Sequence, residues 1–360
     1  MTDTAAGLAA LTIDLDALSR NWLLLKKKLK PGADCGAVVK ADGYGLGAIP
    51  VSRTLEKQGC RHFFVATFDE GLSLREALGP DSLIYVFNGP CGATPDDFAA
   101  HSLIPVLNVP EDVEQWARAD NAPAILHVDT GMNRLGLVSA DIKKIGRNPL
   151  QKINLRYIMS HMACPNVPDH EMNARQLAAF TAVMAEMNLP SRGCLANSAA
   201  ILLGTVYHFD LARPGCAIYG INPVPANPNL FAPVVTAKAR VLQVRSIDRG
   251  NTVGYGARYT ATGPVKTATI ALGYADGVLR SLSMGAGHVY INGTACPVLG
   301  TVTMDLIVVD ATHTAVQPGD WAEMIGPHQT VNALADAAGT IGYEILTALG
   351  QRYERVYTGG

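Results

Sequence analysis

The chain has 360 residues, 48% of them hydrophobic and 17% charged, which is typical of a folded enzyme and excludes a disordered chain. Its formal net charge is -2, so nothing in the charge indicates binding to nucleic acid or to a membrane surface. No apolar run reaches the roughly 18 residues that a membrane span needs. Because the N-terminus lacks the basic start of a signal peptide, we expect a cytoplasmic protein.

Seven cysteines are spread widely along the chain, and none of them forms a CxxC pair. An odd number at such spacing argues against a disulfide framework and against a structural zinc site. We therefore expect free thiols in a reducing compartment and no bound metal.

The first run of alternating residues, 11–15, predicts a strand ahead of an amphipathic helix. We expect it to join the sheet of a second domain, so that residues 1–15 belong with the C-terminal part of the chain. Between residues 35 and 215, short β-rich runs alternate with helical patterns. The runs are 35–41, 62–68, 83–89, 104–109, 124–130, 155–161, 193–198 and 209–215. Eight such repeats predict an α/β fold, a closed (β/α)8 TIM-like barrel over residues 16–230. An open doubly wound sheet is the competing interpretation, but no GxGxxG turn supports it.

The alternation stops after residue 220. Residues 222–229 are rich in proline and asparagine and predict a linker. Strand patterns then dominate, so residues 231–360 predict a mostly-β C-terminal domain. The expected strands are 234–244, 265–272, 288–291, 295–309 and 321–325, and the expected helices are 331–338 and 343–349.

Chemistry in such a barrel lies at the carboxyl ends of the strands. Lys40 ends the first run after Val38 and Val39, so we expect its stem to be buried. A lysine in that place either pairs with a carboxylate or uses a lowered pKa for covalent chemistry with a carbonyl group. Small residues follow the last two strands, where barrels often bind phosphate. A lysine beside a phosphate site favours pyridoxal phosphate, although the structural ion pair stays open.

Several segments resemble the alanine racemase family, in the family's order. The first is 38–47, Val-Val-Lys-Ala-Asp-Gly-Tyr-Gly-Leu-Gly, which is similar to the family's cofactor-attachment signature. The others are 128–136, Ser160-His161, 197–200, 213–220, 273–277 and 300–305. Together these segments are highly specific, although each alone is moderate evidence.

The resemblance implies a two-base mechanism. Lys40 would hold pyridoxal phosphate as an aldimine and act as one base, and Tyr274 would act on the opposite face of the substrate. Racemisation needs two such groups, because one removes a proton and the other returns a proton to the far side. In this family the site is shared within a homodimer, so Tyr274 and Met304 would come from the partner subunit.

The resemblance also implies the binding roles. Tyr44, Ser198 and the backbone of Gly215 and Cys216 would bind the phosphate, and Arg213 would face the pyridine nitrogen. His161 would lie against the ring and link Arg213 to Tyr274. Arg134 would meet the phenolic oxygen of the cofactor and the substrate carboxylate, which the backbone of Met304 would also touch. No residue is expected to bind a metal.

The chain departs from the family pattern at a few positions. Leu46 stands where many relatives have histidine, and His127 where they have a lysine that becomes carbamylated. Because histidine cannot carry that negative group, we predict that a bound anion or a carboxylate braces Arg134, with His127 donating a hydrogen bond to it. Alternatively, His127 only packs on its strand. Gln351 aligns with a phosphate-binding tyrosine, for which Tyr353 is a possible substitute.

The expected function is that of an alanine racemase, an isomerase that interconverts L- and D-alanine and supplies or consumes D-alanine for peptidoglycan. A related racemase of broader specificity stays open, because selectivity depends on the mouth of the pocket. A non-catalytic pyridoxal-phosphate carrier on the same barrel is the third interpretation. It is disfavoured because such carriers typically lack the second domain, whereas this chain has Tyr274 in one.

Overall fold

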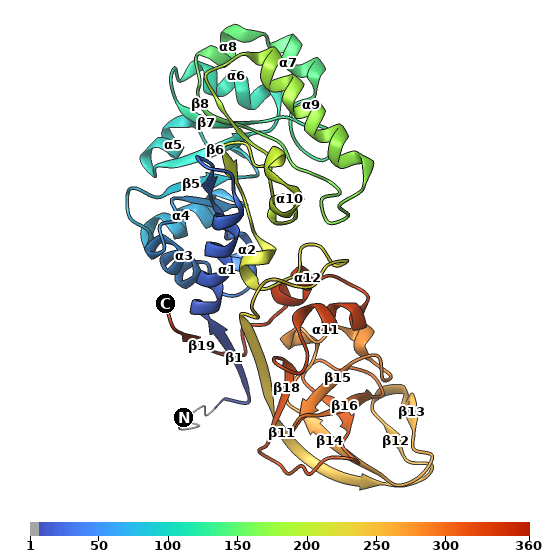
Figure 1. Ribbon diagram of the computed structural model, residues 1–360. Helices are drawn as coiled ribbons and strands as arrows, with labels where there is room; N and C mark the ends of the chain where they lie inside the picture. The colour runs from blue at the N-terminus through green and yellow to red at the C-terminus, as the bar shows by residue number, and fades with distance from the viewer. Residues whose placement is uncertain (1–6) are drawn as a thin grey trace. The chain divides into compact units, whose positions relative to one another are not determined.

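The computed structural model describes residues 7–360, which divide into two compact units (Figure 1). Leu18–Ala232 form one unit, which we call the barrel unit. Residues 7–17 and Pro233–Gly360 form the other, which we call the β unit. No helix in the described range is both long and apolar enough to span a membrane.

Parallel strands form a closed ring in the barrel unit. The strands are β2 (Asp34–Cys35), β3 (Ala37–Val38), β4 (His62–Val65), β5 (Leu83–Val86), β6 (Leu103–Leu107), β7 (Pro123–His127), β8 (Asn154–Met159), β9 (Arg192–Cys194) and β10 (Leu211–Ala212). Strands β3 to β9 pair in chain order, and β10 pairs with β2, which precedes β3 by one glycine. A bridge between Asn197 and Arg213 joins the last two strands, so the predicted (β/α)8 barrel is confirmed.

Helices follow the strands as expected. They are α1 (Leu15–Lys28), α2 (Lys40–Tyr44), α3 (Ala48–Lys57), α4 (Phe68–Ala77), α5 (Pro95–Ala100), α6 (Pro110–Arg118), α7 (Ser139–Ile145), α8 (Arg147–Gln151), α9 (Glu171–Met187), α10 (Ser198–Leu203) and the 3-10 turns η1 (Thr205–Tyr207) and η2 (Cys216–Tyr219). Thr94 caps α5 and Thr67 caps α4, each through a reciprocal bond with an acidic residue three positions later. These caps fix where the helices begin, and therefore where the loops above the strands end.

The β unit contains β1 (Ala9–Asp14), β11 (Val235–Ile247), β12 (Thr252–Val253), β13 (Tyr259–Thr260), β14 (Val265–Ile270), β15 (His288–Ile291), β16 (Thr294–Leu299), β17 (Ile307–Asp310), β18 (Trp321–Ile325), β19 (Glu354–Thr358), α11 (Val331–Ala338), α12 (Gly342–Thr347) and the turns η3 (Tyr255–Ala257), η4 (Tyr274–Asp276) and η5 (Arg280–Leu282). The sheet order is β14-β17-β16-β15-β18-β11-β1-β19. Strand β11 also pairs with β14, so the strands from β14 to β11 in this order form a closed ring. The mostly-β domain is thus confirmed, and β1 lies between β11 and β19 in its sheet.

The single strand expected over residues 295–309 is wrong, because the structure has two strands there. Strand β16 ends at Leu299 and β17 begins at Ile307. Between them, Gly300 has a φ of 67°, and a side chain at that position would press on the carbonyl oxygen of Val253. The chain therefore leaves the sheet and forms a loop, residues 300–306, that carries Met304.

Candidate active site

Lys40 lies at the carboxyl end of the first barrel strand and begins a left-handed turn. Ala41, Asp42, Gly43 and Tyr44 all have φ between 52° and 61°, a region that L-residues rarely adopt. Hydrogen bonds stabilise this turn: the N–H of Ala41 donates to Oε1 of Glu70 at 2.7 Å, and that of Ala48 donates to Oδ1 of Asp42 at 2.9 Å. The turn leads to Tyr44, whose buried ring stacks on that of Tyr219 at 4.5 Å.

Lys40 as a whole residue is exposed, although Val38 and Val39 before it are buried, and the burial of its stem stays a prediction. Its ammonium lies 5.9 Å from the centre of the Phe87 ring. Partial removal from water and the charge of Arg134 lower the pKa of Lys40, and the carboxylate of Glu70 opposes this shift. Lys40 forms no ion pair in the described part of the chain. The structural ion pair is therefore not found, and the lowered pKa suits a lysine that acts as a nucleophile or base.

Glu70 was not singled out by the sequence. Its carboxylate accepts the N–H of Ala41 and, at 2.7 Å, the N–H of Ala66, so it connects the turn after Lys40 to the end of β4. It is also the acidic partner in the capping box of α4 with Thr67. The Thr-x-x-Glu spacing predicts the cap, but nothing in the sequence indicates that the same carboxylate reaches the lysine turn.

Polar groups converge at the ends of the last two strands. The hydroxyl of Ser198 accepts the N–H groups of Gly215 at 2.9 Å and of Ala217 at 3.4 Å. A side chain at Gly215 would overlap the hydroxyl of Tyr44, so only glycine permits this approach. Cys216 follows Gly215 in the same buried turn, η2. The four residues predicted to bind phosphate therefore lie in one place on the barrel.

Arg213 is buried, with 2% of its surface exposed, and in the described part of the chain it forms no ion pair. Its guanidinium donates to the carbonyl oxygens of Cys194 at 2.9 Å and Ser160 at 2.8 Å, which fixes its plane. It also lies 3.4 Å from Nδ1 of His161. Burial and the charge of Arg213 lower the pKa of His161 to about 3. Because arginine can only donate, Nδ1 of the neutral His161 ring accepts this hydrogen bond, and the proton of the ring lies on Nε2.

His127 does not have the role we expected. Its Nδ1 lies 2.7 Å from Oδ1 of Asn108, whose amide group donates to the carbonyl oxygens of Phe87 and Val106. His127 therefore donates from Nδ1. Burial, the largest cause, and the charge of Arg213 lower its pKa to about 4, so the ring is neutral near pH 7. A neutral ring has no second N–H, so His127 cannot donate to an anion as predicted. Asn108 was missed by the sequence reasoning.

Arg134 is exposed in the loop after β7. Its charge lowers the pKa of Lys40, His127 and His161, which places its guanidinium near all three. In residues 7–360 it forms no ion pair, so the predicted carboxylate brace is not found. The bound anion stays a prediction.

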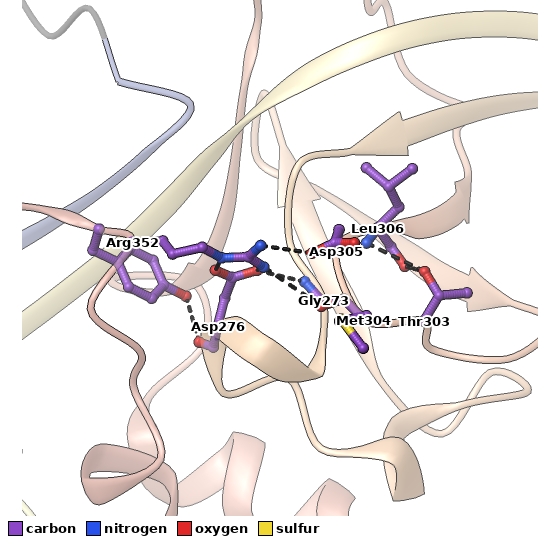
Figure 2. A network of polar contacts seen from close by, with 8 residues as sticks. Gly273, Asp276, Thr303, Met304, Asp305, Leu306 and Arg352 are labelled. Atoms are coloured by element: carbon purple, nitrogen blue, oxygen red, sulfur yellow. Dashed lines mark hydrogen bonds and ion pairs between the residues drawn. The ribbon is translucent and has the colours of Figure 1, made fainter.

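The β unit carries Tyr274 and Met304 on two adjoining loops. Figure 2 labels Gly273 and Asp276 of the first loop and Met304 of the second. The N–H of Tyr274 donates to the carbonyl oxygen of Thr303 at 2.9 Å, and that of Ala275 donates to the carbonyl oxygen of Met304 at 3.1 Å. A side chain at Gly273 would overlap the Met304 backbone. Tyr274 is 41% and Met304 53% exposed, so both side chains are presented to the surroundings.

Tyr353 is unsuited to the phosphate role considered for it. Its ring is buried, and its hydroxyl donates to the carbonyl oxygen of Asp276 at 3.0 Å within the β unit. Gln351 is exposed.

Comparisons with known proteins match these elements. The family model "Alanine racemase, N-terminal domain" matches residues 13–223, and "Alanine racemase, C-terminal domain" matches residues 234–357. The chain belongs to the alanine racemase family. It is 45% identical to the alanine racemase of Rhodospirillum rubrum, over 98% of this chain and 96% of that protein. It is 44% identical to the catabolic alanine racemase of Mesorhizobium japonicum, over 100% of this chain and 96% of that protein.

Solved structures of the family agree with the fold. A crystal structure of alanine racemase from Bartonella henselae, with covalently bound pyridoxal phosphate, has a TM-score of 0.94 and 41% identity. The match covers 98% of this chain and 100% of that chain. Alanine racemase from Streptomyces coelicolor A3(2) has a TM-score of 0.89 and 34% identity, covering 98% of each chain. The family and the two-domain fold expected from the sequence are therefore confirmed.

Proposed function

We propose that this protein is a pyridoxal-phosphate-dependent alanine racemase, with Lys40 and Tyr274 as its two bases. One observation carries the proposal: the lysine of lowered pKa stands on the same barrel end as two other features. They are a buried arginine that pairs with no carboxylate of residues 7–360, and a cluster of groups suited to bind phosphate. The relatives named above are called alanine racemases, and this gives the substrate.

The residues present fit the cofactor. The hydroxyl groups of Tyr44, which lies close to Gly215, and of Ser198 can donate hydrogen bonds to a phosphate without adding positive charge. Arg213 brings a buried positive charge that no carboxylate of the described chain pairs, which suits an anionic, aromatic ligand. In this scheme Lys40 holds the cofactor covalently, and Tyr44, Ser198, Gly215 and Cys216 bind its phosphate.

When bound, pyridoxal phosphate withdraws electrons from the amino acid and makes its α-proton acidic. Arg213 would face the pyridine nitrogen and, because a guanidinium keeps its protons, would donate a hydrogen bond to that nitrogen. The carbonyl oxygens of Ser160 and Cys194 hold the Arg213 guanidinium in the orientation that this hydrogen bond would need. His161, neutral and protonated on Nε2, would pack against the cofactor ring, and its Nδ1 accepts a hydrogen bond from Arg213.

The two bases act on opposite faces of the α-carbon. Lys40 removes the α-proton of D-alanine, and Tyr274 removes that of L-alanine; the other residue then donates a proton to the opposite face. The lowered pKa of Lys40 keeps a larger fraction of its amine unprotonated near neutral pH. Arg134 and the backbone of Met304 orient the substrate carboxylate.

We infer that the enzyme is a homodimer in which Tyr274 and Met304 complete the partner's site. The support is a set of exposed apolar side chains on loops of the β unit: Tyr255, Tyr274, Met284, Met304 and Leu306. Tyr255 is 78% exposed, so its ring is available for contact with a second subunit. We place the protein in the cytoplasm, where its free cysteines would stay reduced.

Two measurements test the proposal. Purified protein should convert L-alanine and D-alanine to the same final mixture of the two, with loss of optical rotation. Other amino acids should be converted less well. Its absorption band near ~420 nm, the range expected for this cofactor bound to a lysine, should vanish on borohydride reduction. Binding of the cofactor without loss of optical rotation would support the non-catalytic carrier instead.

A further inference from the structure

We propose that Arg352 is a positioning residue that clamps the loop of Tyr274 to the loop of Met304. The inference rests on the proposed function of Tyr274 and adds a residue that touches neither substrate nor cofactor. Figure 2 shows the guanidinium of Arg352 lying between Asp276 and Asp305, one from each loop.

The first half of the clamp is a two-pronged ion pair. Nε of Arg352 donates to Oδ1 of Asp276 at 2.7 Å, and Nη2 donates to Oδ2 at 2.6 Å. Asp276 stands two residues after Tyr274 and its side chain is 3% exposed. Oδ2 also accepts the N–H of Gly273 at 2.9 Å, so this carboxylate closes the turn on both sides of Tyr274. Such paired geometry fixes orientation as well as distance.

The second half reaches the other loop. Nη1 of Arg352 donates to Oδ1 of Asp305 at 2.6 Å, and Nη2 lies 3.5 Å from the carbonyl oxygen of Met304. Asp305 is 58% exposed at its side chain, so this bond is not needed to neutralise a buried charge. A planar fork can bind both carboxylates at once, whereas the ammonium of a lysine offers no such plane.

The placement of the clamp has a functional meaning. The two loops already share backbone hydrogen bonds from Tyr274 and Ala275. Yet both loops are exposed at their tips, and the side chains of Tyr274 and Met304 have little packing of their own. Arg352 therefore supplies the rigidity that the exposed tips lack. A base displaced by about 1 Å can lose on the order of 10²-fold in rate.

The test uses Arg352→Gln, Arg352→Lys and Asp305→Asn in the holoenzyme. Arg240→Gln is the matched control, because Arg240 is an arginine of the same unit whose guanidinium stacks 3.7 Å from the centre of the Trp321 ring. The first readout is deuterium exchange of backbone amides in residues 273–277 and 303–306. We expect exchange there to speed up about tenfold in Arg352→Gln, with the amides of β11 and β14 unchanged.

The second readout separates positioning from mere destabilisation. In D2O, D-alanine can lose its α-proton to Lys40 and regain a deuteron on the same face without inversion. A misplaced Tyr274 should thus slow racemisation about 10²-fold while α-deuteration of D-alanine slows much less. The ratio of deuteration to racemisation should rise about tenfold in Arg352→Gln, rise less in Arg352→Lys and Asp305→Asn, and stay unchanged in Arg240→Gln.

The outcomes separate the two proposals. If deuteration and racemisation fall equally, or if the loop amides exchange at the wild-type rate, Arg352 does not position Tyr274. Arg352→Gln could fail to fold, because it leaves Asp276 buried and without its ion-pair partner. In that case Asp305→Asn tests the clamp, since this variant keeps the ion pair between Arg352 and Asp276. A wild-type enzyme that neither racemises nor labels alanine would overturn the proposed function, while the amide exchange would still test the clamp.

Discussion

The turn after Lys40 and the loop of Tyr274 hold their side chains by different means. The Lys40 turn has an unfavourable left-handed backbone, kept in place by hydrogen bonds to the carboxylates of Glu70 and Asp42 and by the barrel beneath it. The Tyr274 loop has no comparable run of left-handed residues and is tied by an arginine to two carboxylates. The lysine lies near the charges of Arg134 and Glu70, whereas the tyrosine stands beside an ion-paired cluster of one arginine and two carboxylates.

This difference fits the chemistry of each group. Neighbouring positive charge favours the unprotonated amine, so Arg134 lowers the pKa of Lys40. A loop whose carboxylates both have an arginine partner can lie against another protein surface without leaving either carboxylate unpaired. Under the proposed function, the barrel side binds an anionic ligand and the loop side docks against a second subunit.

Removing the amine should have the largest effect. Lys40→Ala should reduce racemisation by more than the about 10²–10⁴-fold expected for a lost base, because the covalent link to the cofactor is lost too. Mass spectrometry after borohydride reduction should find the cofactor on residue 40 of the wild type and nowhere in the variant. Lys57→Ala, an exposed lysine of α3, is the control and should keep both. Cofactor fixed to another lysine in the wild type would contradict the assignment.

Tyr274→Phe tests the loop side. Its ring should stay in place because only the hydroxyl is lost, so we expect the cofactor colour to remain while racemisation falls about 10²–10⁴-fold. Racemisation at the wild-type rate would mean that another group is the second base.

Gly215→Ala should weaken cofactor binding on the barrel side, about tenfold, and destabilise the fold by about 1–3 kcal/mol, because the new methyl overlaps the Tyr44 hydroxyl. Adding Tyr44→Phe removes the overlap. The double variant should regain stability in thermal unfolding but not affinity, since it lacks a phosphate donor. Regained affinity would show that the Tyr44 hydroxyl does not bind phosphate.

The pH dependence of stability gives the smallest effect. His127 has a pKa of about 4 in the folded protein, below its ordinary 6.5, so the unfolded chain binds a proton first as pH falls. The free energy of unfolding should therefore fall between pH 6.5 and 4, and His127 should contribute nothing above that range. His127→Gln should reduce this fall by on the order of 1 kcal/mol between pH 6.5 and 5 in denaturant titrations. An unchanged slope would show that His127 titrates normally.

Much of the barrel and its site is predictable from local sequence. Apolar runs mark the strands, and the residues just after them, such as Lys40 and Arg213, necessarily lie at one end of the barrel. The loop between β16 and β17 was missed because Val302 and Ile307 continue a strand-like pattern across it. Only the positive φ of Gly300 shows where the chain leaves the sheet.

The supporting residues could not be predicted, because their partners are distant along the chain. Glu70 binds the backbone 29 residues before it, Asn108 binds His127 across 19 residues, and Arg352 reaches Asp276 across 76. Each is an ordinary polar residue in its local sequence. Their roles appear only when the strands and loops are assembled.

The most direct test of the account is to mix two inactive variants, Lys40→Ala and Tyr274→Phe. If each site takes its lysine from one subunit and its tyrosine from the other, a mixed dimer has one intact site and one doubly defective site. Random exchange of equal amounts should then restore about a quarter of the wild-type racemisation rate. Subunit exchange should be verified with one tagged variant. No recovery after complete exchange would contradict a site shared between two chains.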